Sequence, residues 1–270
     1  MPIRVVLFDL DNTLLLEDEA TERALSRTSD IAADRTGVDA RVICAAAAAA
    51  AEQLFRTAPA FDYADAMGIW WGEALWGAFA GDDAGLRSLR AFIPGFRHEV
   101  WTHALAAAAV ADRELADELA AAFPRSRRAI SIIDPDAEGT LDDLAGDHRL
   151  GLVTNGAGDV QREKLAAAAL AGRFDEIVIS AEIGVGKPDA RIFHAALDAF
   201  GVSAADAVMV GDSLERDVAG ARHAGLRSVW LDRGIGDGGP VSPDARIGAL
   251  GELRHALMDL ERAGALPRPA

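Results

Sequence analysis

The apolar run Val5 to Leu10 (VVLFDL) constrains the fold most, because it indicates a buried strand with no strand partner nearby. Short apolar runs return only after Pro124, where they alternate with helical stretches. This alternation predicts strand–helix–strand units and a parallel sheet. We therefore expect the first strand to join a later sheet, with further strands at 150–154, 177–180, 207–211 and 228–231.

The residues between the first strand and this sheet are rich in alanine and other helix formers. They predict helices at 18–36, 39–57, 62–80, 84–91, 95–110 and 112–123. We expect an α/β chain of two domains, with the sheet in residues 1–16 and 131–270 and an all-helical insertion at 17–130. The segment 233–244 indicates a loop, and the tail after Gly264 is expected to be loose.

Four tryptophans, Trp70, Trp71, Trp76 and Trp101, fall within the helical insertion. We expect them in its core, with the alternative that one or two line a pocket.

The net charge of −16 restricts the partners of this chain. A strongly acidic surface repels nucleic acid and anionic membrane, so we expect neither as a partner. No apolar run has transmembrane length, and Val5–Leu10 is too short for the core of a signal peptide. The single cysteine cannot form an internal disulfide and favours a reducing, cytoplasmic location. A monomer and a homodimer both stay open.

Of the 27 basic residues, only Lys164 and Lys187 are lysines. A lysine in such a background is a candidate for a specific role, because its compact ammonium is not equivalent to the arginine fork. We expect Lys187, in the loop GVGKPD, to have that role and Lys164 to be solvated on a helix. A solvated basic turn is expected from Arg125, Arg127 and Arg128, and ordinary helix-start acids from Glu17, Asp18 and Glu19.

Polar clusters follow the predicted strands at their carboxyl ends, where open parallel sheets bind ligands. Asp9 and Asp11 point the same way because strand side chains alternate. Two such carboxylates repel unless a cation lies between them or one holds a proton. Mg²⁺ prefers oxygen ligands of this kind, and a carboxylate can also act as a nucleophile or a proton donor.

The other clusters suit a phosphate and a metal. Thr154 and Asn155, followed by Gly156, offer a hydroxyl and backbone N–H groups for phosphate oxygens. Lys187 can neutralise a phosphate and hold a carboxylate in place. Helix capping accounts for one of the acids Asp212 and Asp217 but less well for both, so metal ligation is the better interpretation of Asp212.

Together these motifs resemble those of the haloacid dehalogenase superfamily in order and spacing. The resemblance rests on DxDxT at Asp9–Thr13, Thr154 at a strand end, Lys187 before a proline, and GDxxxxD at Gly211–Asp217. It covers residues 4–16 and about 130–232, and the insertion resembles the family's type 1 cap in position and helical character. TNG at 154–156 and the run VISAEIGVGKPD are most similar to the branch of N-acylneuraminate-9-phosphatase and related nucleotide and sugar phosphatases.

The resemblance implies a Rossmann-like core with an inserted all-α cap, and it implies residue roles. Asp9 would attack phosphorus and become an aspartyl phosphate, while Asp11 would protonate the leaving oxygen and then activate water. Phosphate oxygens would bind Thr154 and the Asn155 backbone, with Lys187 beside them. Mg²⁺ would bind Asp9, the Asp11 carbonyl and Asp212, supported by Thr13 and Gly211, and Asp217 would support the metal or orient Lys187.

The predicted function is therefore a Mg²⁺-dependent phosphomonoesterase acting on a small phosphorylated metabolite, a sugar phosphate or a nucleotide. A phosphomutase of the β-phosphoglucomutase kind retains both acids and stays open as an alternative. A 2-haloacid dehalogenase is disfavoured by Asp11, because the family's dehalogenases lack the second aspartate. A non-catalytic binding module is disfavoured by the intact set of clusters.

Overall fold

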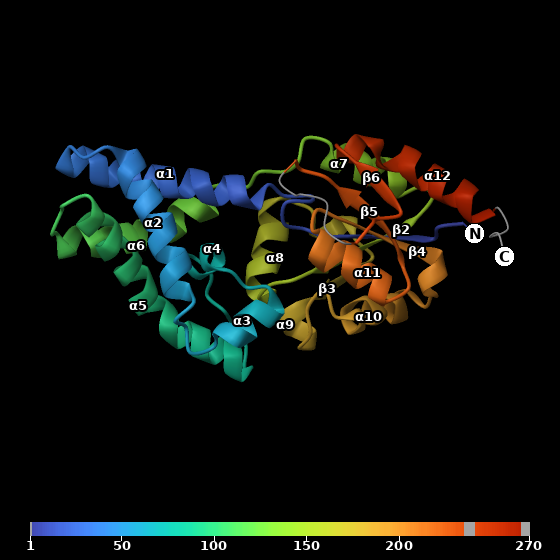
Figure 1. The fold of residues 1–270 in the computed structure, drawn as a ribbon, viewed down its shortest axis with the longest axis horizontal. Coiled ribbons are helices and arrows are strands. Elements are labelled where there is room, and N and C mark those ends of the chain that lie inside the picture. Colours follow the sequence, from blue (N-terminus) through green and yellow to red (C-terminus); the bar gives the residue numbers. More distant parts are fainter. Residues whose placement is uncertain (1, 235–240, 266–270) are drawn as a thin grey trace. The chain divides into compact units, whose positions relative to one another are not determined.

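The computed structural model describes residues 2–234 and 241–265, and it divides into two compact units (Figure 1). Unit 1 comprises Met1–Leu16, Ile133–Asn155 and Leu165–Ala270, as far as these are described. Unit 2 comprises Glu17–Ile132 and Gly156–Lys164. Residues 235–240 of the predicted loop and residues 266–270 of the predicted loose tail lie outside the described residues.

The described part of unit 1 forms a six-stranded parallel sheet in the order β3-β2-β1-β4-β5-β6. Its strands are β1 (Val5–Phe8), β2 (Arg149–Thr154), β3 (Glu176–Ile179), β4 (Ala207–Gly211), β5 (Arg227–Leu231) and β6 (Ala245–Ile247). The expected α/β class is confirmed, and β1 pairs with the distant strands β2 and β4 as predicted. The sequence did not predict β6, whose three residues are too few to show a period.

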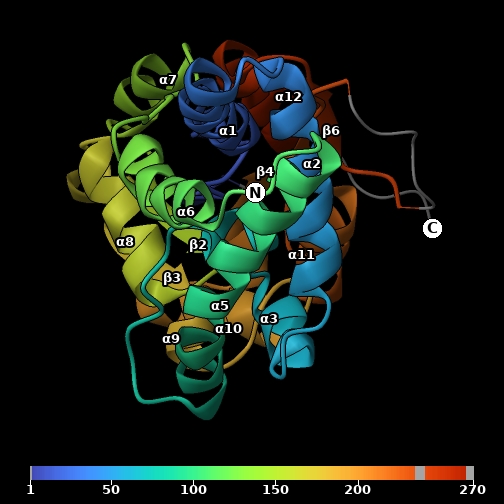
Figure 2. The same cartoon turned by 90° about the vertical axis from the view of Figure 1, so that its left-hand side faces the viewer.

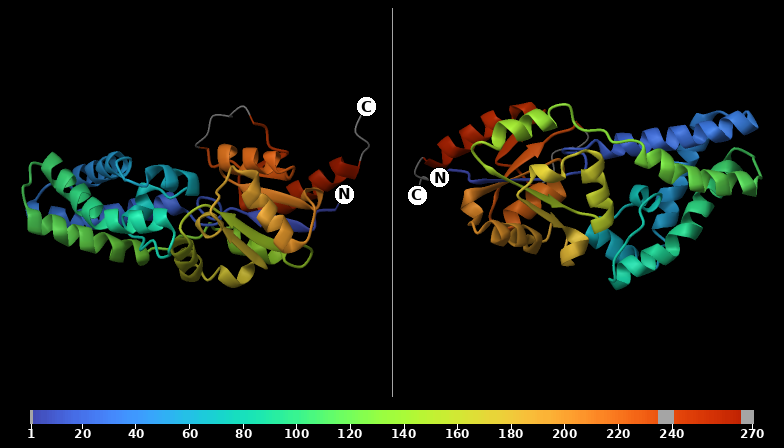
Figure 3. Two further views of the ribbon diagram at one scale, coloured as in Figure 1. Left: turned by 90° about the horizontal axis from the view of Figure 1, so that it is seen from below. Right: turned by 180° about the vertical axis from the view of Figure 1, so that it is seen from behind.

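Helices cover both faces of this sheet (Figures 1 and 3). They are α7 (Ala137–Leu144), the end of α8 (Gly158–Ala167), α9 (Ser180–Ile183), α10 (Ala190–Phe200), α11 (Ala219–His223) and α12 (Leu253–Ala265). Val6 and Phe8 pack with α7 and α12, whereas Val5 and Leu7 pack with α10 and α11. Because alternate residues face opposite layers, β1 is apolar throughout. Helices α7, α9 and α12 were not predicted from the sequence.

Unit 2 is helical apart from its turns (Figure 2). Its helices are α1 (Glu17–Thr36), α2 (Ala40–Phe55), α3 (Phe61–Met67), α4 (Trp71–Ala74), α5 (Ala84–Ala107), α6 (Arg113–Arg128) and the start of α8. In the long helices, α1 packs on α2 and α6, and α5 also packs on both. Aspartates at 39, 83 and 112 cap α2, α5 and α6 by accepting backbone N–H bonds.

Two helix predictions in this unit are wrong. The expected helix 62–80 is broken, because α3 ends at Met67, the next residue Gly68 has a left-handed conformation, and α4 begins only at Trp71. The expected helices 84–91 and 95–110 form the single helix α5, which continues through Pro94. Ile93 and Phe96 are both buried beside that proline, so packing outweighs the lost backbone hydrogen bond.

The tryptophans divide between the two expected environments. Trp76 and Trp101 are buried in the core of unit 2. Trp70 and Trp71 line a cavity of about 730 Å³ together with residues of α1 and α2. No helix in the described ranges combines the length and apolarity needed to cross a bilayer.

Lys164 is not solvated, and that prediction is wrong. Its side chain is 2 % exposed, and its Nζ lies 2.8 Å from Glu73 Oε1 and 3.6 Å from Glu17 Oε2. Arg127 is also buried and pairs with Glu17, while its Nη1 donates to the Ile130 carbonyl at 2.8 Å. The local sequence could not show this, because Glu73 lies 91 residues before Lys164. Arg125 and Arg128 are exposed as expected, but they lie in the last turn of helix α6 and not in a separate basic turn.

Lys164→Met is expected to lower the unfolding free energy of unit 2 by about 3–5 kcal/mol, because it removes the ammonium that the buried Glu73 carboxylate contacts, whereas Glu17 keeps Arg127. Urea unfolding followed by tryptophan fluorescence measures this change. The control is Arg56→Met, which breaks an exposed pair with Glu52 and should leave the unfolding midpoint nearly unchanged. Equal effects of the two substitutions would contradict the buried network.

Candidate active site

The register of the sheet brings the predicted motifs to one edge. Phe8 lies level with Leu152 on β2 and with Val210 on β4. Beyond Phe8 the chain enters the Asp9–Asp11 loop. Thr154 lies two residues after Leu152, and Asp212 lies two residues after Val210. The strand order reverses between β1 and β4, and such switch points are where open α/β sheets bind ligands.

The loop after β1 is tightly folded. The Leu10 carbonyl accepts backbone hydrogen bonds from Thr13 at 3.3 Å and from Leu14 and Leu15 at 2.9 Å. Asn12 has a φ of 58°, in the left-handed region that asparagine tolerates better than most residues. Asp11 is partly exposed in this loop, two residues after Asp9.

Thr13 joins this loop to the end of β4. The Asp212 backbone N–H donates to Thr13 Oγ1 at 3.1 Å, and the Thr13 hydroxyl donates to Asp212 Oδ1 at 3.2 Å. Trp230 also holds this end of β4, because its indole N–H donates to the Asp212 carbonyl at 2.8 Å. The sequence did not reveal Trp230, which has the pattern of an ordinary apolar strand residue.

Lys187 is buried between two carboxylates. Its Nζ lies 2.7 Å from Asp9 Oδ1 and 2.7 Å from Asp217 Oδ1, and the side chain is 2 % exposed. Its backbone is held by Asn155, whose Nδ2 donates to the Lys187 carbonyl at 2.9 Å and whose Oδ1 accepts from the Lys187 N–H at 2.8 Å. This use of the Asn155 side chain was not predicted. Thr154 lies beside it, buried at the end of β2.

Asp217 is occupied at both carboxylate oxygens. Oδ1 contacts Lys187, and Oδ2 accepts a hydrogen bond from the Ser213 N–H at 3.0 Å. A Cβ at Gly211 would lie 2.2 Å from Asp217 Oδ2, so a side chain there would displace the carboxylate. Glycine at the end of β4 therefore permits the close approach of Asp217 to the strand.

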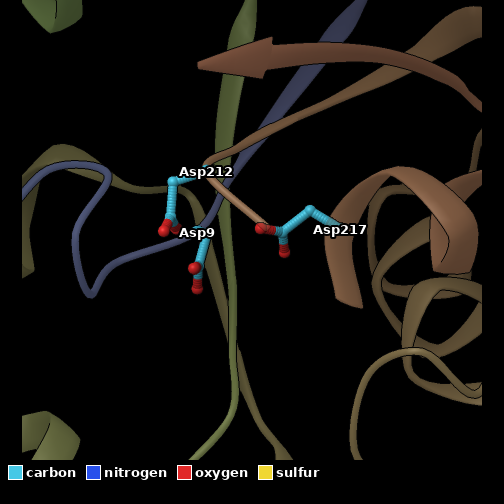
Figure 4. A group of neighbouring side chains, drawn as sticks. All are labelled: Asp9, Asp212 and Asp217. Atoms are coloured by element: carbon cyan, nitrogen blue, oxygen red, sulfur yellow. The ribbon is translucent and has the colours of Figure 1, made fainter. Parts of the chain in front are cut away.

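Carboxylate oxygens of Asp9, Asp212 and Asp217 lie within 4.8 Å of one another. In Figure 4 the side chains of Asp212 and Asp217 are directed towards Asp9. This donor set suits a hard divalent cation, which prefers oxygen ligands.

The site carries surplus negative charge, and this is visible in its pKa values. Burial raises the pKa of Asp9 well above its usual range. Lys187 lowers this pKa but only partly offsets burial, and the charges of Asp217 and Asp212 raise it further. Burial and the nearby Asp217 raise the pKa of Asp212 to about 7. Burial disfavours the charged form of Lys187, but Asp217 and Asp9 outweigh it and raise the lysine pKa. A cation beside Asp9 and Asp212 would favour the ionised form of both side chains.

Comparisons with known proteins give one family and several relatives. The family model described as a haloacid dehalogenase-like hydrolase matches residues 3–225. The chain is 44 % identical to phosphoserine phosphatase from Thermus thermophilus over 253 residues, which cover 93 % of this chain and 98 % of that protein. It is 40 % identical to N-acylneuraminate-9-phosphatase from Mus musculus over 123 residues, covering 45 % of this chain and 50 % of the relative.

A solved structure also resembles the whole fold. HAD-hydrolase YfnB from Bacillus subtilis, bound to magnesium in its crystal, superposes with a TM-score of 0.66. The match covers 95 % of this chain and 99 % of that one, with 21 % sequence identity, and it supports the fold alone.

Asp212→Asn is expected to raise the melting temperature of the metal-free protein at pH 8 and to raise it less at pH 5. The pKa of Asp212 is raised from 3.8 to about 7, so its contribution to stability is complete only below pH 3.8 and is lost progressively as pH rises through the folded pKa. Asparagine cannot ionise, yet it keeps an oxygen for the Thr13 hydroxyl.

Thermal unfolding in excess chelator at both pH values measures this effect. Asp198→Asn, on the exposed side of α10, is the matched control and should shift neither curve. An identical shift of Asp212→Asn at both pH values would argue against charge repulsion as its cause.

Proposed function

The chain belongs to the haloacid dehalogenase-like hydrolase family, and on this premise we propose that it is a cytoplasmic, Mg²⁺-dependent phosphatase of a small phosphorylated metabolite. The observation that carries the proposal is the buried contact of Lys187 with Asp9, 2.7 Å apart, at the switch point of the sheet. A phosphate ester and a carboxylate nucleophile repel each other. Fixed positive charge beside the nucleophile is therefore what phosphoryl transfer requires.

In the first proposed step, a carboxylate oxygen of Asp9 attacks phosphorus and the bond to the leaving oxygen breaks. Asp11 gives its proton to that oxygen, and the alcohol departs. In the second step, Asp11 takes a proton from water, whose oxygen attacks phosphorus; the bond from phosphorus to Asp9 breaks, inorganic phosphate is released and the Asp9 carboxylate is restored. The Thr154 hydroxyl and the Asn155 N–H would bind phosphate oxygens, with Lys187 beside them.

Asp9, Asp212 and the backbone carbonyl of Asp11 would hold Mg²⁺, which would supply further positive charge to the phosphate oxygens. The raised pKa values of Asp9 and Asp212 support this assignment, because both carboxylates would be stabilised by a further positive charge. Asp217 fits the other predicted role, that of orienting Lys187, since both of its oxygens already have donors.

We place phosphoserine first among candidate substrates, because the Thermus thermophilus relative aligns over nearly the whole chain. The match to N-acylneuraminate-9-phosphatase covers about half of each chain and supports a sugar phosphate less strongly. In this proposal residues 17–130 act as the cap and the remaining residues as the catalytic core. Asp11 continues to weigh against dehalogenation, which needs no proton for the leaving group.

Asp9→Asn is expected to abolish Mg²⁺-dependent release of p-nitrophenol from p-nitrophenyl phosphate, because an amide is not a nucleophile for phosphorus. Circular dichroism establishes that the variant is folded, and Asp198→Asn should retain wild-type activity. Full activity of a folded Asp9→Asn protein would sink the assignment of the nucleophile.

Incubation of the wild-type protein with O-phosphoserine and Mg²⁺ is expected to yield serine and inorganic phosphate in equal amounts. A parallel panel of sugar phosphates and nucleotides tests the substrate assignment. Phosphate released only from the panel would overturn phosphoserine but keep the phosphatase. Isomerised sugar phosphate without free phosphate would favour the phosphomutase instead.

A further inference from the structure

The loop that carries Asp11 is held both by its own backbone and by one distant side chain. The Leu10 carbonyl accepts hydrogen bonds from three backbone N–H groups. The carbonyls of Asn12 and Thr13 both accept hydrogen bonds from the side chain of Arg233. Arg233 follows β5 by two residues, and the sequence assigned it only to a loop.

The Arg233 guanidinium contacts three separate groups. Its Nε donates to the Asn12 carbonyl at 2.9 Å, its Nη2 donates to the Thr13 carbonyl at 2.8 Å, and its Nη1 lies 2.7 Å from Asp134 Oδ2. The side chain is 20 % exposed. A planar fork can serve all three at once, whereas a lysine ammonium could not match that geometry.

Asp134 is itself fixed to the same loop. Its side chain is 4 % exposed, and its backbone N–H donates to the Leu14 carbonyl at 2.9 Å. Its Oδ1 accepts the Asp136 N–H at 2.9 Å, which leaves Oδ2 for Arg233. Arg233 therefore rests on a carboxylate that is already tied to the loop's far end.

Asp11 lies between two such fixed points. Before it, the Asp9 N–H donates to the Val210 carbonyl at 2.9 Å and anchors the strand end. After it, Arg233 holds the next two peptide groups. Because Thr13 also bonds to Asp212, the same guanidinium is one residue removed from a proposed metal ligand.

We propose that Arg233 is a positioning residue for the acid–base Asp11, holding its loop so that the carboxyl group reaches the leaving oxygen. The inference rests on the proposed function, in which Asp11 donates that proton. A displacement of about 1 Å at such a group can cost on the order of a hundredfold in rate.

A positioning role predicts a dependence on the leaving group that lost stability would not produce. An alkoxide, such as that of serine, needs a proton as its bond to phosphorus breaks, whereas p-nitrophenolate departs readily without one. Removal of Arg233 should therefore slow the alkyl ester much more than the aryl ester. The parameter to compare is kcat/KM, since it reports the steps up to departure of the leaving group.

The experiment measures kcat/KM for O-phosphoserine and p-nitrophenyl phosphate at saturating Mg²⁺. Arg233→Gln is expected to lose roughly ten- to a hundredfold with phosphoserine and under about threefold with the aryl ester. Arg233→Lys should show a smaller change of the same kind. Asp11→Asn provides the reference pattern, with the larger loss expected when the acid itself is removed.

The matched control is Arg254→Gln on α12. Arg254 also binds a carboxylate, that of Asp147 at 3.0 Å, but it lies away from the Asp11 loop and should change neither substrate. Circular dichroism and melting temperatures establish that each variant is folded. If Arg233→Gln does not fold, Arg233→Lys takes its place in the comparison of the two esters.

Equal losses for the two esters in a folded Arg233 variant, or no loss at all, would overturn the positioning role while leaving the phosphatase intact. Absence of phosphate release by the wild-type protein from either ester would overturn the proposed function, and the inference with it.

Discussion

The ion pair of Lys187 with Asp9 and Asp217 is the interaction on which the site depends. Burying three carboxylates at one sheet edge is unfavourable, and a single ammonium between two of them makes the arrangement tolerable. Much of the surrounding structure serves this contact. Asn155 fixes the lysine backbone, and Gly211 leaves room for Asp217 against the strand.

The remaining charge imbalance gives the site its chemical character. Burial, with Asp217 and Asp212 nearby, raises the pKa of Asp9 in spite of Lys187, and burial and Asp217 raise the pKa of Asp212, so both side chains ionise less readily than an ordinary aspartate. Asp9 must be ionised to act as the proposed nucleophile. Stability and activity are therefore expected to favour different protonation states, and a divalent cation would reconcile them.

The sequence predicted strands β1 to β5 and the motif residues next to them, because these depend on residues close together in the chain. The strands from β1 to β5 are mainly apolar because both sheet faces are covered, and Asp9 and Asp212 directly follow β1 and β4. The features that were missed depend on partners distant in sequence. The sequence around Lys164 is that of a surface helix, and only the fold brings Glu73 and Glu17 to its side chain. Likewise, only the fold brings the Arg233 guanidinium to the carbonyls of the Asp11 loop. Similarly, α5 continues through Pro94 because it packs against α2 and α6, and helix propensities do not include such tertiary contacts.

Unit 2 is built from two separate chain segments, and this limits how it could be exchanged between related proteins. Its two segments, Glu17–Ile132 and Gly156–Lys164, are separated in sequence by α7 and β2 of unit 1. Lys164, at the end of the second segment, is buried against acids of the first. The helical unit is therefore not a self-contained cassette. A chimera that exchanged only the long insertion would place a foreign surface around Lys164, so a workable graft between relatives should transfer the first turns of α8 as well.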